Sequence, residues 1–161
     1  MGIKKTAIDG YQAELNFKSL AESGGFTVHR APPVYDSKEH WDLQLSIKVD
    51  VKAMKKLNRH HNEPNPEWHW IEISSGYGDG KGWVYGSHAD LVAFEMPETW
   101  ILVQLKTLQE WLSTKIEKTW VTRPEDAKYR LYKRVEGEAI TLVETEWLKT
   151  IGKEISKHVS K

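Results

Sequence analysis

Apolar and polar residues alternate without a break from Trp41 to Lys52. The apolar parity consists of Trp41, Leu43, Leu45, Ile47, Val49 and Val51. The polar parity consists of Asp42, Gln44, Ser46, Lys48, Asp50 and Lys52. A period of two residues is typical of extended chain with one buried face. The pattern therefore predicts β-structure in which two aspartates and a lysine leave the backbone on the same side.

This alternating run is long enough to fold back on itself near Ser46. In that case Asp42 and Asp50 become cross-strand neighbours, with Cβ atoms about 5 Å apart if they are directly opposed. Like charges at that distance repel, so the pair is stable only with a cation between them. The simpler alternative is an amphipathic strand pair whose polar face is solvated.

The other segments predict a mixture of helices and short strands. Apolar residues at helical spacing predict helices over 6–23 and 105–116 and from Thr145 onward, with Gly24-Gly25 as the stop of the first. Strands are predicted over 26–29, 68–73, 83–85, 89–94, 99–103, 129–134 and 139–143. The last two form a hairpin around Glu136-Gly137. This order predicts an α+β (α/β) fold, a central mixed β-sheet flanked by helices.

Composition and length narrow the class of protein. A chain of 161 residues suits one domain with a proper core. The 23 Lys and Arg residues balance 23 Asp and Glu residues, so a nucleic-acid-binding protein of this kind must concentrate its basic residues locally. Local candidates include 52–61 and 128–134, although each also fits an ordinary solvated face. The absence of cysteine excludes disulfides and zinc–thiolate sites.

No apolar run approaches the length of a membrane span, and no signal-peptide core follows the first residues. We therefore expect no membrane partner and a cytoplasmic, soluble protein.

Asp42, followed by Asp50-Val51-Lys52, resembles the signature of the PD-(D/E)XK nuclease superfamily, which includes restriction endonucleases and archaeal Holliday-junction resolvases. The resemblance implies a restriction-endonuclease-like core over about residues 7–116. A C-terminal hairpin-helix extension then completes a single domain over 1–161. It also implies a metal-dependent endonuclease of phage or resolvase type that hydrolyses phosphodiester bonds of DNA. Branched DNA such as a Holliday junction is a candidate substrate, and a phage-infected host is a candidate setting.

The resemblance also assigns roles to individual residues. Asp42 and Asp50 ligate Mg²⁺, for which Mn²⁺ is the expected substitute, because hard oxygen ligands suit these ions. Lys52 stabilises the transition state or positions the attacking water. Glu14, on the first helix, matches the glutamate that completes the metal site in resolvase-like members. It also fits a surface glutamate paired with Lys18, one turn away.

Four further positions carry weaker signals. His40, which resembles the lead-in to the first catalytic aspartate, could contact a phosphate or a metal-bound water, or could cap the strand. Glu72 is a candidate outer-sphere ligand, and Asp90 is interpreted as structural. Trp70 shares one strand face with Trp68, which predicts either core packing or a groove wall. An exposed aromatic residue near the glycine turn at 74–82 could stack on an unpaired base.

A second hypothesis comes from another class of protein, a non-catalytic nucleic-acid-binding or assembly module that keeps the nuclease fold. The neutral net charge favours this module, whereas the complete set of Asp42, Asp50 and Lys52 favours the enzyme. The sequence leaves open the choice between DNA and RNA and the oligomeric state. A homodimer is expected for a resolvase, and a monomer suits a nicking enzyme.

Overall fold

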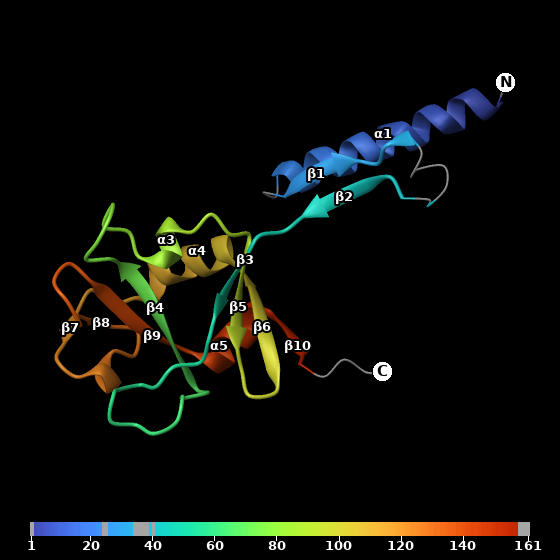
Figure 1. Ribbon diagram of the computed structural model, residues 1–161. Helices are drawn as coiled ribbons and strands as arrows, with labels where there is room; N and C mark the ends of the chain where they lie inside the picture. Colours follow the sequence, from blue (N-terminus) through green and yellow to red (C-terminus); the bar gives the residue numbers. More distant parts are fainter. Residues whose placement is uncertain (1, 24–25, 34–38, 40, 158–161) are drawn as a thin grey trace. The chain divides into compact units, whose positions relative to one another are not determined.

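The computed structural model describes residues 2–23, 26–33, 39 and 41–157, with side chains from residue 11 onward. The chain forms two compact units, residues 1–48 and 49–161, whose elements are labelled in Figure 1. The structure is mixed α+β with several sheets, which confirms the predicted class. The restriction-endonuclease-like core remains a prediction. Gly24-Gly25 and His40 lie outside the described residues.

The described part of the N-terminal unit contains a long helix and a two-stranded sheet. Helix α1 spans Gly2–Ser23 and confirms the predicted first helix. Strands β1 (Thr27–Arg30) and β2 (Leu43–Ser46) pair antiparallel along their full length.

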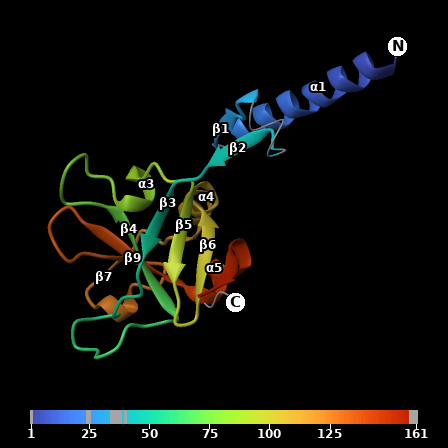
Figure 2. The same ribbon diagram turned by 45° about the vertical axis from the view of Figure 1, so that its right-hand side comes forward.

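The first sheet of the C-terminal unit has the strand order β10-β6-β5-β3. It is formed by β3 (Val49–Lys52), β5 (Leu91–Glu95), β6 (Thr99–Gln104) and β10 (Lys153–Ser156). Strand β3 runs parallel to β5, whereas β6 is antiparallel to both β5 and β10. Figure 2 shows β3, β5 and β6 side by side. Among the described strands, β3 therefore lies at one edge of this sheet.

The second sheet has the order β4-β9-β8-β7. It is formed by β4 (Trp68–Ser74), β9 (Ala139–Glu144), β8 (Leu131–Tyr132) and β7 (Trp120–Val121). A short 3₁₀ helix, η1 (Pro124–Asp126), lies between β7 and β8. The predicted hairpin is present as the β8–β9 pair, in which Tyr132 lies opposite Ile140.

Three α-helices of the C-terminal unit are described: α3 (Trp83–Gly86), α4 (Leu105–Lys115) and α5 (Thr145–Ile151). Helix α4 confirms the predicted second helix. The predicted strand over 83–85 is wrong, because the chain turns at Gly82 and forms α3 instead. A Cβ atom at Gly82 would lie 2.1 Å from the Glu72 carbonyl oxygen, so this turn requires glycine.

The predicted C-terminal helix ends earlier than expected. Helix α5 stops at Ile151, and the chain then continues as β10 along β6. At Gly152 a Cβ atom would lie 2.8 Å from the Leu102 carbonyl oxygen. The close approach of these two segments therefore favours glycine at the point where the helix gives way to the strand.

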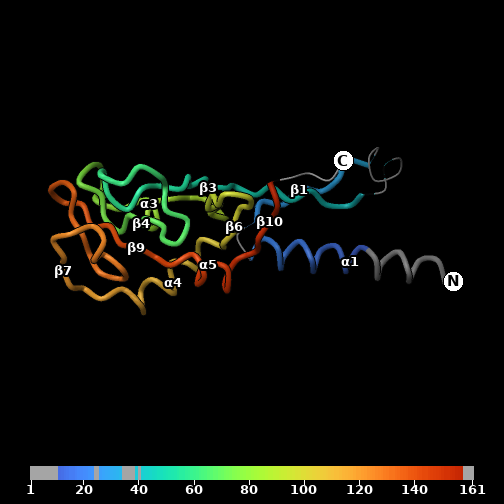
Figure 3. The backbone as a smooth tube through the Cα atoms, turned by 90° about the horizontal axis from the view of Figure 1, so that it is seen from below, coloured from blue at the N-terminus to red at the C-terminus, as the bar shows by residue number. Residues whose placement is uncertain are grey.

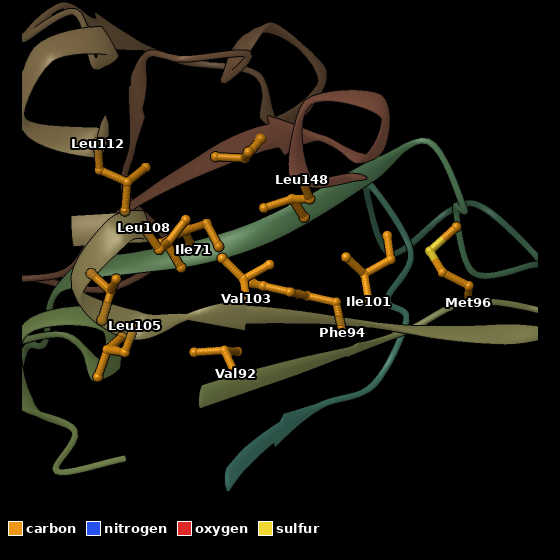
Figure 4. Close-up of a cluster of buried hydrophobic side chains, with 12 residues drawn as sticks. Ile71, Val92, Phe94, Met96, Ile101, Val103, Leu105, Leu108, Leu112 and Leu148 are labelled. Carbon is orange, nitrogen blue, oxygen red and sulfur yellow. The ribbon is translucent and has the colours of Figure 1, made fainter. Parts of the chain in front are cut away.

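The hydrophobic core of the C-terminal unit takes side chains from both sheets and from all three of its described α-helices. Phe94 of β5, Ile71 of β4 and Leu108 of α4 are fully buried members, and Figure 4 shows them together. Figure 3 shows α4 and α5 along one side of this unit and β3 along the other. This packing leaves β3 at the margin of the core. None of the described helices is both long and apolar enough to cross a membrane.

Candidate functional site

The predicted Asp50 and Lys52 lie on β3, at the edge of the first sheet. In the parallel ladder Asp50 is opposite Val92 and Lys52 is opposite Phe94. Val92 and Phe94 are fully buried, so Asp50 and Lys52 share the core-facing side of the sheet with them. Their side chains keep 24% and 25% of their surface exposed, respectively. The margin of the core thus holds an aspartate and a lysine that solvent still reaches.

The apolar side chains of β3 face solvent and its polar side chains face the core, which is the reverse of the prediction. Val49 and Val51, on the parity predicted to be buried, are 46% and 59% exposed. Asp50 and Lys52 can face the core because neighbouring groups on that side stabilise their charges. The Lys52 ammonium lies 4.2 Å from the centre of the Trp83 ring of α3 and 3.0 Å from the Asp50 carboxylate. These two contacts compensate the charges on the half-buried side of the strand.

The predicted hairpin within the alternating run is wrong. Strand β2 pairs with β1, and β3 pairs with β5. The segment from Ser46 to Val49 contains neither Gly, Pro, Asn nor Asp, so it lacks the residues that stabilise a tight hairpin turn. The expected cross-strand pairing of Asp42 with Asp50 therefore does not form through a β2–β3 ladder.

Asp42 and Glu14 belong to the N-terminal unit. Asp42 is exposed, and its backbone carbonyl accepts a hydrogen bond of 2.8 Å from Ala31 N–H. Glu14 pairs with Arg30 of β1 rather than with Lys18. Arg30 also lies over the Tyr11 ring, at 4.6 Å from its centre. Any metal that takes Glu14 as a ligand must therefore compete with the Arg30 guanidinium.

Asp50 has the donor chemistry of a Mg²⁺ ligand, because its carboxylate oxygens are hard and solvent reaches them. Mg²⁺ commonly uses only one or two carboxylates and keeps several waters. Within the described ranges, no three His, Asp or Glu residues gather closely enough to hold a metal ion. The Asp50 carboxylate alone is thus compatible with Mg²⁺, whereas a preformed site of three protein ligands is not found among the described residues.

The weaker candidates have different surroundings. The carboxylate of Glu72 lies near Arg134 and helps to raise the pKa of that guanidinium, after the larger effect of the Arg134–Glu138 hydrogen bond. The Asp90 backbone carbonyl accepts a hydrogen bond of 3.0 Å from Leu105 N–H, at the start of α4. This backbone contact ties the first turn of α4 to the residue before β5, and it does not involve the Asp90 side chain, so the structural role of Asp90 stays a prediction.

A pocket that was not predicted as a unit lies over the outer face of the second sheet. It has a volume of about 670 Å³, and its lining includes Lys55, Lys56, Arg59, Trp70, Tyr132 and Arg134. We call it the Trp70 pocket. Trp70 therefore forms a groove wall, one of the two interpretations of its strand face. The basic run at 55–59 was the available sequence signal, but Tyr132 of β8, which lines the same pocket, lies more than sixty residues later in the sequence.

In comparisons with known proteins, no family model, curated protein or solved structure matches this chain.

Proposed function

We propose that this chain is a metal-dependent DNA endonuclease of the PD-(D/E)XK type, with branched DNA as a candidate substrate. The observation that supports the proposal best is the Asp50–Lys52 pair on β3. It combines a metal-binding carboxylate with an ammonium group 3.0 Å away, and solvent reaches both. In metal-dependent phosphodiester cleavage a carboxylate can hold the metal, and a nearby ammonium group can stabilise the negative charge that develops on the phosphate.

In this proposal the Asp50 carboxylate is a ligand of Mg²⁺. When bound, Mg²⁺ polarises the phosphate and lowers the pKa of the attacking water. The Lys52 ammonium stabilises the negative charge that develops on the phosphoryl oxygens. The water oxygen forms a new bond to phosphorus, and the bond between phosphorus and the 3′ oxygen breaks. The products are a 5′-phosphate and a 3′-hydroxyl.

The test is cleavage of end-labelled DNA with Mg²⁺, with Mn²⁺ and with chelator. Duplex, single-stranded, flapped and four-way-junction substrates of matched sequence are compared. We expect cutting with either ion and none with EDTA, because Asp50 and Lys52 alone do not supply the activated water. Preference for the junction would identify a resolvase, and preference for the flap a flap nuclease. Cutting that EDTA leaves unchanged, or no cutting of any substrate, contradicts the proposal.

A non-catalytic nucleic-acid-binding module is the second candidate. The observations that favour it are the Lys52 ammonium already paired with Asp50, the Arg30 guanidinium paired with Glu14, and the lack of a three-residue metal cluster in the described chain. Titration with Mn²⁺, followed by electron paramagnetic resonance, separates the two. The enzyme should bind Mn²⁺ and lose that binding in Asp50→Asn, whereas the module should bind none.

A further inference from the structure

The Trp70 pocket has the composition of a nucleotide site. Part of its lining is aromatic, because the rings of Trp70 and Tyr132 lie with their centres 6.2 Å apart and their planes at 37°. Its rim carries Lys55, Lys56 and Arg59, whose side chains are exposed. The volume of about 670 Å³ falls within the range of small-ligand sites. An aromatic surface beside several cations is the combination that holds a base and its phosphates.

The charge balance of the pocket favours an anion. Lys55, Lys56 and Arg59 form no ion pair with any described residue. Arg134, in contrast, is neutralised by Glu138, to which its Nε donates a hydrogen bond of 2.9 Å. Glu125 is the acidic residue of the lining. The three exposed cations thus outnumber the one carboxylate that borders the same space.

The wall of the pocket is already ordered without a ligand. The Asn58 side chain accepts hydrogen bonds of 2.8 Å from His60 N–H and 3.2 Å from His61 N–H, and it also donates to Glu125 of η1. The Trp70 indole N–H donates to the Lys56 carbonyl at 3.1 Å, which fixes the ring against the loop. Binding therefore costs little ordering of the basic loop.

From this geometry we infer that the Trp70 pocket binds an unpaired nucleotide of a single DNA strand. The base lies against Trp70 and Tyr132, and Lys55, Lys56 and Arg59 contact the flanking phosphates. Bases within a duplex are stacked on each other, so their faces cannot reach the Trp70 and Tyr132 rings. The choice of DNA as the ligand rests on the proposed function. The pocket would then give a flapped or branched substrate a contact that intact duplex lacks.

The experiment measures fluorescence anisotropy of a labelled 12-mer, single-stranded or as a duplex, with the full chain in EDTA. We expect the single strand to bind more tightly than the duplex. Tyr132→Leu should lower single-strand affinity about tenfold with an unchanged salt dependence, because it removes stacking and no charge. Lys55→Ala/Lys56→Ala should lower affinity and also reduce the slope of log K against log salt by about 1.4, since each phosphate that a lysine neutralises contributes about 0.7.

Two variants serve as matched controls. Phe17→Leu removes an aromatic ring that is 52% exposed and lies outside the pocket, and Lys115→Ala/Lys118→Ala removes two exposed lysines elsewhere. Both should bind as the parent does. Equal affinity of the parent and both pocket variants, equal losses in the controls, or tighter binding of the duplex would overturn the inference. If Tyr132→Leu unfolds, the Lys55→Ala/Lys56→Ala variant still tests the inference, because both lysines are exposed.

This experiment is independent of cleavage. Binding is read without metal, and a denaturing gel shows whether the labelled strand stays intact. If the chain cuts no DNA but the pocket variants lose affinity, the nuclease proposal fails and the pocket inference stands. If metal-dependent cutting occurs while the pocket variants bind normally, the nuclease proposal stands and the pocket inference fails.

Discussion

Asp50→Asn is expected to abolish metal-dependent cleavage while leaving DNA binding intact. The change removes the charge of the carboxylate that faces Lys52 at 3.0 Å, but it removes almost no volume. A metal contributes several kcal/mol of transition-state stabilisation, and a loss of about 4 kcal/mol corresponds to about a thousandfold in rate. The measurement is the single-turnover cleavage rate of the preferred substrate in Mg²⁺, together with its binding affinity in EDTA.

The fold should tolerate this substitution. Asparagine keeps a side-chain oxygen that can accept a hydrogen bond from the Lys52 ammonium, and solvent reaches about one quarter of both side chains, so Lys52 is not left without a polar partner. Asp79→Asn is the matched control, because Asp79 lies in the exposed glycine turn, where it accepts a hydrogen bond from Lys81 N–H that asparagine can also accept. The nuclease assignment is refuted by an Asp50→Asn variant that cuts as fast as Asp79→Asn. A thermal unfolding curve for each variant excludes loss of fold as the cause.

The pattern of apolar residues predicted those helices and strands whose structure is determined mainly by residues close to them in the sequence. Helix α4 follows directly from apolar residues at helical spacing, because Leu105, Leu108 and Leu112 all face the core. Strand β4 was predicted within one residue from a run of aromatic and β-branched residues. In both cases the local preference and the tertiary packing favour the same structure.

The sequence did not show which strands pair with each other or where two backbone segments approach closely. Alternation predicted extended chain over 41–52, but the partners of β2 and β3 depend on strands elsewhere in the chain. The buried side of β3 was also misassigned, since the Trp83 ring that attracts Lys52 comes from α3. For the site, the sequence predicted the proximity of Asp50 and Lys52. It did not predict the Trp70 pocket, whose walls converge only in the fold.

The other large predicted effect concerns His69, which lies in β4 with its side chain directed into the core. It is only 4% exposed, and its ring centre lies 5.1 Å from that of Phe94. No described residue forms a hydrogen bond with its Nε2. Burial lowers the pKa of His69 from 6.5 to about 4, because the charged imidazolium loses its hydration there. His69 is therefore neutral in the folded chain at neutral pH.

Acidification is expected to destabilise the fold through this residue. Between pH 6.5 and about 4 the unfolded chain binds a proton at His69 that the folded chain does not, so stability falls as the pH falls. The shift in pKa corresponds to a loss of about 3 kcal/mol in the free energy of unfolding, which levels off below pH 4. Urea unfolding of the parent across this range measures the total effect.

His69→Phe isolates the contribution of His69, because it keeps an aromatic ring beside Phe94 and removes the titrating group. Carboxylates such as Glu138, whose pKa is lowered by its hydrogen bond with Arg134, also weaken the fold in acid, but they do so equally in both proteins. The difference in unfolding free energy between parent and variant should therefore change by about 3 kcal/mol from pH 7 to pH 4 in favour of the variant. A constant difference over that range would show that His69 accepts a proton in the folded core as readily as in the unfolded chain.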